Sequence, residues 1–222
     1  MLDPETFSGS RRHPARFALT TLALFALAMR AGAGPPAPLS PADLAKLERG
    51  ELLVATRPVP GSSFREGIGR ALLPAPAERL WRALTDYAHY EEFMPFLEES
   101  TAEPQPDGSV LSAQRLVFPG ALGERRFRAR YRSAIERGAA GTAVYRVSWE
   151  SLPNSGSLRA ERGSFTLEPR GGKTLVTCRL YLDPGDAIAF LVNPQTEKSI
   201  SWILDGLRQH VRRSRYDAAG VP

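Results

Sequence analysis

The feature that most constrains this fold is a series of short alternating segments followed by one long segment with helical spacing. The first of five strand-like segments is apolar-rich and the next four largely alternate apolar and polar residues, and turns containing Gly or Pro separate them. These connections are too short for crossover helices, so the segments are expected to form an antiparallel meander. The expected strands cover residues 110–118, 124–135, 142–150, 157–168 and 174–182. Within the fourth strand, Gly163 suggests a bulge that changes the face occupied by the residues after it.

The long segment near the end of the chain has the spacing of an amphipathic helix. Apolar residues recur there every three or four positions, which predicts one apolar face. These residues are Ile200, Ile203, Leu204, Leu207 and Val211. We expect a brief helix at residues 187–192, a new start at Asn193 and Pro194, and a helix that reaches about Tyr216. Roughly 22 residues span about 33 Å, so this helix can lie across a whole sheet.

One strand and two short helices precede the meander. Residues 63–73 have a strand-like pattern, which Pro74 ends because proline restricts the residue before it to extended geometry. Residues 76–84 have helical spacing, and Asp86 can begin a second short helix that Pro95 stops. Together the elements predict an α+β fold, in which a curved antiparallel sheet of six or seven strands wraps around the long C-terminal helix.

The segment 124–135 separates two kinds of side chain onto two faces. The face expected to be buried carries Phe127, Ala129, Tyr131 and Ile135. The opposite face carries Arg126, Arg128, Arg130 and Arg132. We interpret these arginines as a solvated face that pairs with acidic residues such as Glu150 and Glu161. The alternative is a surface for weak contact with anionic membranes or envelope polyanions.

The first 33 residues contain the three parts of an export signal. Arg11, Arg12 and Arg16 precede an uncharged apolar run at residues 17–29, and small residues follow up to Ala33. The run is short for a bilayer core of roughly 30 Å. We therefore expect cleavage after Ala33 and a periplasmic or secreted protein, with an uncleaved anchor as the alternative.

The remaining sequence divides into three parts. Residues 34–62 are expected to form a spacer with one short helix, which Ser40 caps and which runs to about Arg49. Residues 63–216 are expected to form the folded domain, and residues 217–222 a tail.

Composition and motifs argue against several functional classes. A net charge of +5 with 24% charged residues is too small to require a nucleic-acid partner. The single cysteine, Cys178, lies in an expected apolar strand and has no partner for an intramolecular disulfide. Beyond the signal only His89 and His210 remain, so no metal site is expected. No cofactor is expected, because the glycine-containing stretches 67–72 and 171–174 depart from nucleotide-binding patterns.

Two stretches carry a resemblance to a known superfamily. Residues 72–87, followed by Phe93-Met94-Pro95, are similar to the opening pattern of the START-like, or helix-grip, superfamily, which includes the birch-pollen-allergen-like proteins. Residues 163–169 and the following 171–174 are similar to one of its later strands and hairpins. Within the superfamily the chain resembles the polyketide cyclase/dehydrase and coenzyme Q-binding group, over about residues 63–215. The resemblance implies a helix-grip fold, in which the gap between sheet and helix is often incompletely filled.

The apolar residues of the expected inner face therefore have two interpretations, a solid core or the lining of a pocket. The resemblance favours a pocket for a hydrophobic small molecule such as a lipid, a quinone or a polyketide-like compound. The residues expected to contact this ligand are Trp81, Phe93, Phe96, Phe118, Phe127, Tyr131, Tyr145, Trp149, Leu180, Ile203 and Leu207. No catalytic motif is recognisable, so an exported binding or carrier protein is the leading hypothesis.

A cyclase or dehydratase that uses the same pocket is the alternative function. Its candidate proton donors or acceptors are Tyr131, Tyr145 and His89. Asp86 lies three residues before His89 and could orient its imidazole ring.

Overall fold

The computed structural model of the chain describes residues 37–217, apart from residues 121–122, 139–140 and 186–188. The expected export signal at residues 1–33 lies outside the described residues. Residues 187 and 188, which begin the expected brief helix at 187–192, also lie outside the described residues. Of the expected tail at 217–222, only Asp217 is described.

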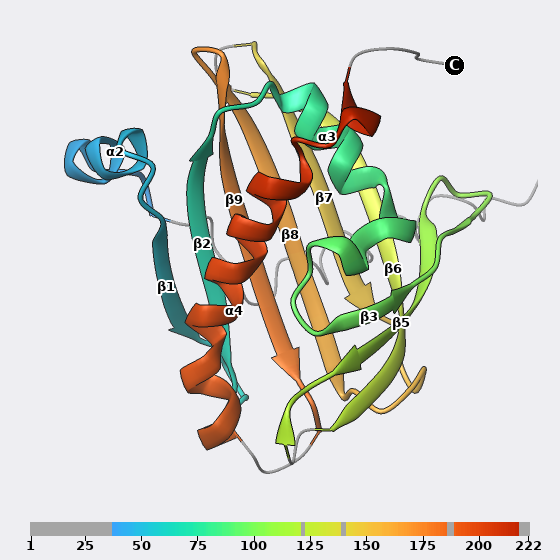
Figure 1. Cartoon of the computed structure of the whole chain (residues 1–222). Coiled ribbons are helices and arrows are strands. Elements are labelled where there is room, and N and C mark those ends of the chain that lie inside the picture. Colours follow the sequence, from blue (N-terminus) through green and yellow to red (C-terminus); the bar gives the residue numbers. More distant parts are fainter. Residues whose placement is uncertain (1–36, 121–122, 139–140, 186–188, 218–222) are drawn as a thin grey trace, which may run out of the picture. The chain divides into compact units, whose positions relative to one another are not determined.

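The described residues form a nine-stranded sheet in the order β1-β2-β9-β8-β7-β6-β5-β3, with β4 paired to β5 (Figure 1). Every adjacent pair is antiparallel, as the short connections predict. The strands are β1 Leu53–Pro58, β2 Arg65–Leu73, β3 Leu97–Ser100, β4 Glu103–Pro104, β5 Val110–Val117, β6 Glu124–Arg137, β7 Ala143–Ser151, β8 Ala160–Arg170 and β9 Lys173–Asp183. The predicted α+β fold class is confirmed, although the sheet has more strands than the six or seven expected.

The additional strands are short or lie at an edge of the sheet. β1 pairs only with β2 and has no buried residue, so it lacks the apolar alternation that marks a half-buried strand. It lies within residues 34–62, which were expected to be a spacer, and Pro58 ends it as proline commonly does at an edge. β3 and β4 have four and two residues, which is too few for a periodic signal.

Three α-helices and two 3-10 turns accompany the sheet in the described residues. They are α2 Pro41–Glu48, α3 Ala77–Thr85, η1 Tyr87–Glu92, α4 Ala189–His210 and η3 Ser214–Tyr216. Ser40 caps α2 as predicted, accepting a hydrogen bond from the Asp43 N–H at 3.1 Å. Leu47 of α2 packs against Leu72 and Leu175 on the outer side of the sheet.

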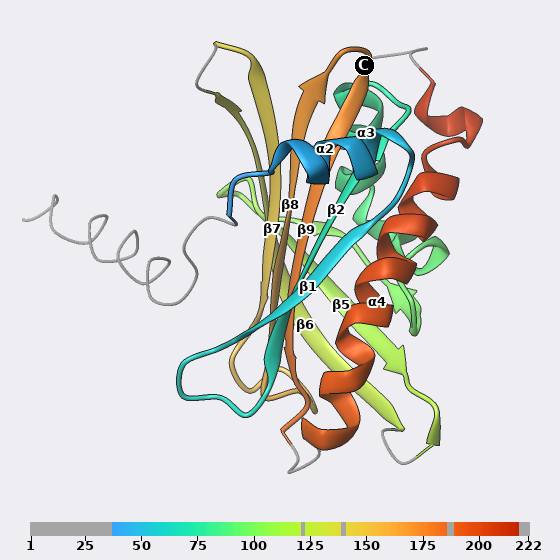
Figure 2. The same ribbon diagram turned by 90° about the vertical axis from the view of Figure 1, so that its left-hand side faces the viewer.

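The long helix α4 runs along the opposite face of the sheet (Figures 1 and 2). The predicted new start at Asn193 and Pro194 was wrong, because α4 is continuous and contains Pro194. Asn193 does not cap a helix. Its side chain accepts a hydrogen bond from the Arg65 N–H at 3.0 Å and donates one to the Ser63 carbonyl at 2.9 Å, so it joins α4 to the start of β2. The helix ends at His210 rather than near Tyr216.

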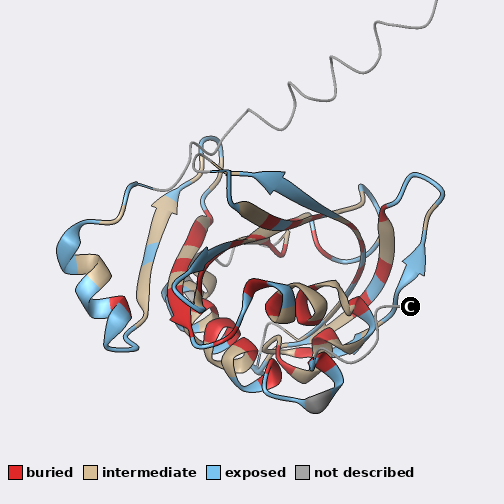
Figure 3. Ribbon diagram, turned by 90° about the horizontal axis from the view of Figure 1, so that it is seen from above, coloured by how far each residue is buried: buried red, intermediate tan, exposed pale blue. Residues whose placement is uncertain are grey.

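The core lies between the sheet and the helices α3 and α4, where the buried positions gather (Figure 3). The predicted apolar face is confirmed, because Ile200, Ile203, Leu204 and Leu207 of α4 are buried, as is Val211 directly after the helix. Helix and sheet approach closely because β2 has glycine at the contact. A Cβ at Gly69 would lie 2.2 Å from Ile200 Cγ2, so only glycine admits the helix here.

The predicted bulge at Gly163 was wrong. β8 keeps an unbroken register with both neighbours, and Gly163 stands opposite Trp149 and Leu180. The glycine instead makes room for an aromatic ring, since a Cβ there would lie 2.2 Å from Trp149 Cζ2. Without a bulge, Glu161 occupies the inner face with Gly163, and it is only 6% exposed.

Two further expectations about faces need correction. Glu161 cannot pair with the arginines of β6, because its side chain is buried on the inner side of the sheet. Ile135 was expected to be buried with Phe127 and Tyr131, but it is 60% exposed. The end of β6, residues 133–137, is exposed on both faces, so nothing covers Ile135 there.

Candidate ligand-binding cavity

A cavity of about 480 Å³ lies between the first half of α4 and the ends of β2, β5 and β9. Helix α4 contributes Thr196, Ser199 and Trp202 to its lining, and β9 contributes Leu180 and Leu182. Its volume falls in the range of about 300–1,000 Å³ that is typical of small-molecule sites. The lining is mainly apolar, which suits a hydrophobic ligand.

Three aromatic residues, which we call the aromatic rim, border this cavity. They are Phe96, Phe118 and Trp202. The ring of Phe96 lies 5.2 Å from that of Phe118 and 5.7 Å from that of Trp202, measured between centroids. The backbone of Phe96 is held by its carbonyl, which accepts a hydrogen bond from the Val117 N–H at 2.8 Å. Trp202 is 47% exposed, so the cavity reaches the surface beside it.

A smaller chamber of about 60 Å³, which we call the inner chamber, adjoins this cavity. The two spaces are neighbours because they share lining residues. Both are lined by Phe96, Phe118, Leu180, Leu182 and Ser199. The inner chamber adds Met94, Leu97, Gln114, Glu161 and Ile203 to the lining. Two of these side chains, Gln114 and Glu161, are polar and buried.

Glu161 has an asymmetric environment. The Trp149 Nε1–H donates a hydrogen bond to Glu161 Oε1 at 2.8 Å. Oε2 is buried, and no described protein group forms a hydrogen bond with it. Burial penalises the charged form and raises the pKa of Glu161 to about 7, while the hydrogen bond from Trp149 acts in the opposite direction. The carboxyl group can therefore gain or lose a proton near neutral pH.

The other polar groups around the inner chamber are uncharged. The Gln114 Nε2–H donates a hydrogen bond to Tyr131 Oη at 2.8 Å. Burial raises the pKa of the Tyr131 phenol well above its ordinary value, so this hydroxyl stays protonated at neutral pH. The ring of Tyr131 stacks on that of Trp149, with centroids 5.8 Å apart. The chamber thus offers hydrogen-bonding groups in an apolar setting.

The structure divides the predicted ligand-contacting residues into two groups. Phe96, Phe118 and Leu180 line both spaces, and Ile203 lines the inner chamber. The others pack in the hydrophobic core, either as buried members or against it. These are Trp81, Phe93, Phe127, Tyr131, Tyr145, Trp149 and Leu207. Contact between ligand and any of the predicted residues stays a prediction.

Sequence reasoning missed the polar and helical part of the lining. Glu161 was assigned to the outer face as a partner of the β6 arginines, and a bulge at Gly163 would be consistent with that assignment. Ser199 and Trp202 lie off the apolar stripe of α4, whereas Thr196 is in phase with Ile200 and Ile203 but is polar, so an apolar pattern selects none of the three. The sequence carries one signal for Trp202, a large aromatic residue on the polar side of an amphipathic helix.

The candidate proton donors of the alternative enzyme function line neither of these two spaces. His89 does lie beside Asp86 as predicted, with 2.7 Å between His89 Nδ1 and Asp86 Oδ1. The Tyr145 hydroxyl donates a hydrogen bond to Glu78 Oε1 at 2.7 Å. Tyr131 is fully buried in the core.

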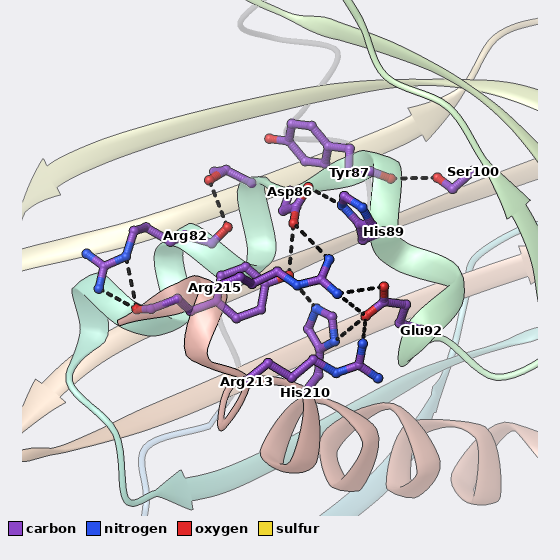
Figure 4. Close-up of polar contacts among 11 residues, drawn as sticks. Arg82, Asp86, Tyr87, His89, Glu92, Ser100, His210, Arg213 and Arg215 are labelled. Carbon is purple, nitrogen blue, oxygen red and sulfur yellow. Dashed lines mark hydrogen bonds and ion pairs between the residues drawn. The ribbon is translucent and has the colours of Figure 1, made fainter. Parts of the chain in front are cut away.

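His89 and Asp86 belong to a polar network at the C-terminal end of α4 (Figure 4). The Tyr216 hydroxyl donates to Asp86 Oδ2 at 2.9 Å and lies 2.7 Å from His210 Nε2. Glu92 forms ion pairs with Arg213 and Arg215. This network joins η1 to the end of α4 and to η3. It therefore fixes the end of the helix that does not line the cavity.

The arginines of β6 have acidic partners in the structure. Arg126 pairs with Glu124 at 2.6 Å, and Arg128 pairs with Glu103 at 3.4 Å. The last two, Arg130 and Arg132, share Asp107 at 3.3 and 3.6 Å. The prediction that Glu161 pairs with these arginines was wrong, because Glu161 is buried on the inner side of the sheet. Contact of this face with an anionic membrane stays a prediction.

Neither a membrane-spanning helix nor a metal cluster is present in the described residues. No helix there is long and apolar enough to span a membrane. No group of three or more His, Cys, Asp or Glu side chains in the same residues could hold a metal ion.

A family model described as polyketide cyclase/dehydrase and lipid transport matches residues 73–208. Among solved structures, a STAR-related lipid transfer protein from Xanthomonas axonopodis has a TM-score of 0.63 and 24% identity, with 73% of this chain and 94% of that one covered. Human StAR-related lipid transfer protein 5 has a TM-score of 0.60 and 13% identity, with 86% and 93% covered. The Zhui aromatase/cyclase from a Streptomyces species has a TM-score of 0.51 and 12% identity, with 77% and 100% covered. At these identities the likeness shows the fold alone. No curated protein matches the sequence significantly.

Proposed function

This chain belongs to the polyketide cyclase/dehydrase and lipid transport family, and on that premise we propose that it is an exported protein that binds or carries a hydrophobic small molecule. The ligand occupies the cavity between the sheet and the first half of α4. Structures with this fold include proteins named for lipid transfer and for aromatase/cyclase activity, so the fold does not decide between binding and catalysis.

The observation that carries the proposal is the cavity itself. It measures about 480 Å³, has a mainly apolar lining and reaches the surface at Trp202. A ligand that buries roughly 300 Å² of apolar surface there would gain about 7.5 kcal/mol before the cost of association. Hydrophobic burial can therefore supply useful affinity. The proton donors considered for a cyclase line neither the cavity nor the inner chamber, which favours binding over catalysis.

Native mass spectrometry combined with lipid extraction tests this function. We expect protein purified from its source to carry a hydrophobic molecule in one-to-one ratio, or to take one up from a panel of fatty alcohols, quinones and phospholipids. Bound ligand should also raise the melting temperature, because it binds only the folded state. Protein that stays empty with every member of the panel, with no thermal shift, would contradict the proposal.

The export part of the proposal is supported by the sequence of residues 1–33, in which arginines, an apolar run and small residues follow one another. We expect the mature protein, isolated from cells, to begin at Gly34. N-terminal sequencing checks this. A protein found in the cytoplasm with its first 33 residues intact would contradict export, and one retained in the membrane with them intact would support the anchor instead.

A further inference from the structure

The inner chamber contains one buried polar atom that the protein leaves without a hydrogen bond. Glu161 is 6% exposed and lines the chamber, and its Oε2 has no partner among the described groups. A buried carboxyl oxygen without a partner is unfavourable, because it has lost its hydrogen bonds to water. A bound molecule with a suitable polar group can restore the missing bond.

The carboxyl group is held in place from several sides. Trp149 donates to Oε1, and the Glu161 N–H donates to Ser151 Oγ at 2.9 Å. The Trp149 indole is itself fixed between the ring of Tyr131 and the bare backbone of Gly163. With Oε1 occupied, Oε2 is the oxygen left for a ligand. A site with one preset contact of this kind selects a ligand by its polar group.

We propose that Glu161 binds the hydroxyl or carbonyl group of an otherwise hydrophobic, uncharged ligand through Oε2. This inference rests on the proposed function and names the class of ligand. The inner chamber, at about 60 Å³, has room for one small polar group while the apolar body stays in the larger cavity. A carboxylate or phosphate headgroup is disfavoured, because it would be desolvated beside a carboxyl group. Among the described residues, Arg65 is the one cation that lines either space, and it lines the larger one.

The protonation state of Glu161 determines whether it can bind a carbonyl group, a hydroxyl group or both. Its pKa of about 7 means that the protonated carboxyl can donate to a carbonyl oxygen below pH 7, whereas the ionised form can only accept. A hydroxyl group can bind either form, because it both donates and accepts. The groups around Glu161 are Gln114 from β5, Tyr131 from β6, Trp149 from β7, Leu182 from β9, and Ser199 and Ile203 from α4. Among these only Tyr131 is titratable, and it stays neutral in this range.

A pair of matched probes tests the inference. 4-Hexylphenol and 4-hexyltoluene differ only by a hydroxyl in place of a methyl group. We expect the purified wild-type protein to bind the phenol roughly tenfold more tightly than the toluene, as measured by displacement of the fluorescent probe N-phenyl-1-naphthylamine. Glu161→Leu should abolish this preference while leaving the toluene bound. Glu161→Gln should keep most of it, because an amide of the same shape still donates and accepts.

A third probe, 4-hexylacetophenone, carries a carbonyl group. Its affinity for the wild-type protein should fall between pH 6 and pH 8, and its affinity for Glu161→Gln should not change, which a merely structural role of Glu161 would not produce. Equal binding of phenol and toluene by the wild-type protein, or an unchanged preference in Glu161→Leu, would overturn the inference and leave the proposed function standing. Failure of the wild-type protein to bind any of the probes would instead count against the proposed function, and with it the inference.

Discussion

Replacing Ser199 with tryptophan should weaken ligand binding about 70-fold while leaving the fold intact. Ser199 lies on α4 and lines both the larger cavity and the inner chamber. An indole at this position would occupy the space where the ligand packs. If the ligand loses roughly 100 Å² of buried apolar surface, it loses about 2.5 kcal/mol, which weakens binding about 70-fold. Titration of 4-hexylphenol into the variant measures the loss.

Lys198→Trp provides the matched control for Ser199→Trp. Lys198 is the preceding residue of the same helix, and its side chain is exposed. A tryptophan there adds the same bulk and hydrophobicity outside the cavity, so affinity should stay within about twofold of wild type. Circular dichroism and thermal melting should show both variants folded. Unchanged affinity in a folded Ser199→Trp variant would place the ligand somewhere other than this cavity.

Glu161 should make the protein less stable as the pH rises through neutrality. Burial raises the pKa of Glu161 from an ordinary value of 4.5 to about 7 in the folded state. The folded state therefore holds this proton more tightly than the unfolded chain does. The stabilisation is fully present below about pH 4.5 and is lost as the pH rises through 7. With about 1.36 kcal/mol per pKa unit, the loss between pH 5 and pH 8 is about 2 to 3 kcal/mol.

Urea denaturation of the ligand-free protein at pH 5 and pH 8 measures this effect. Glu161→Gln removes the titrating group and keeps the side-chain shape, so the difference in free energy of unfolding between variant and wild type isolates the contribution of Glu161. We expect the variant to gain about 2 to 3 kcal/mol over wild type between pH 5 and pH 8. A difference that does not change with pH would show that the carboxyl group is hydrated and has an ordinary pKa.

The arrangement of the sheet and the long helix could be predicted from the sequence because both depend on periodicity. The alternation of β7 places Tyr145, Val147 and Trp149 on one buried face. The apolar stripe of α4 likewise predicts which side of the helix meets the sheet. Strands without such a pattern, such as β1, were missed because only pairing with β2 defines them.

The cavity could be predicted only in part, because its position depends on how well the core is filled. Most of the predicted ligand-contacting aromatic residues look alike in the sequence, but tyrosines from η1 fill one region of the core. Tyr87 and Tyr90 pack against Tyr131 there, with centroids 4.7 and 5.5 Å away. The space that remains open lies by the first half of α4. The spacing of apolar residues in the sequence does not distinguish the filled part of the core from the part that stays open.

The inward position of Glu161 could not be predicted because glycine in a strand has two meanings. A glycine can mark a bulge or a place where another group approaches closely. Gly163 has the second role, since the Trp149 ring lies where its Cβ would be. The choice between the two reverses the face of every strand residue on one side of the glycine.

A crystal structure of the protein grown with 4-hexylphenol tests the central claim most directly. We expect electron density for one molecule between α4 and β9, with its alkyl chain against Phe96, Phe118 and Leu180. Side chains that fill this space, or a ligand bound elsewhere, would contradict the account.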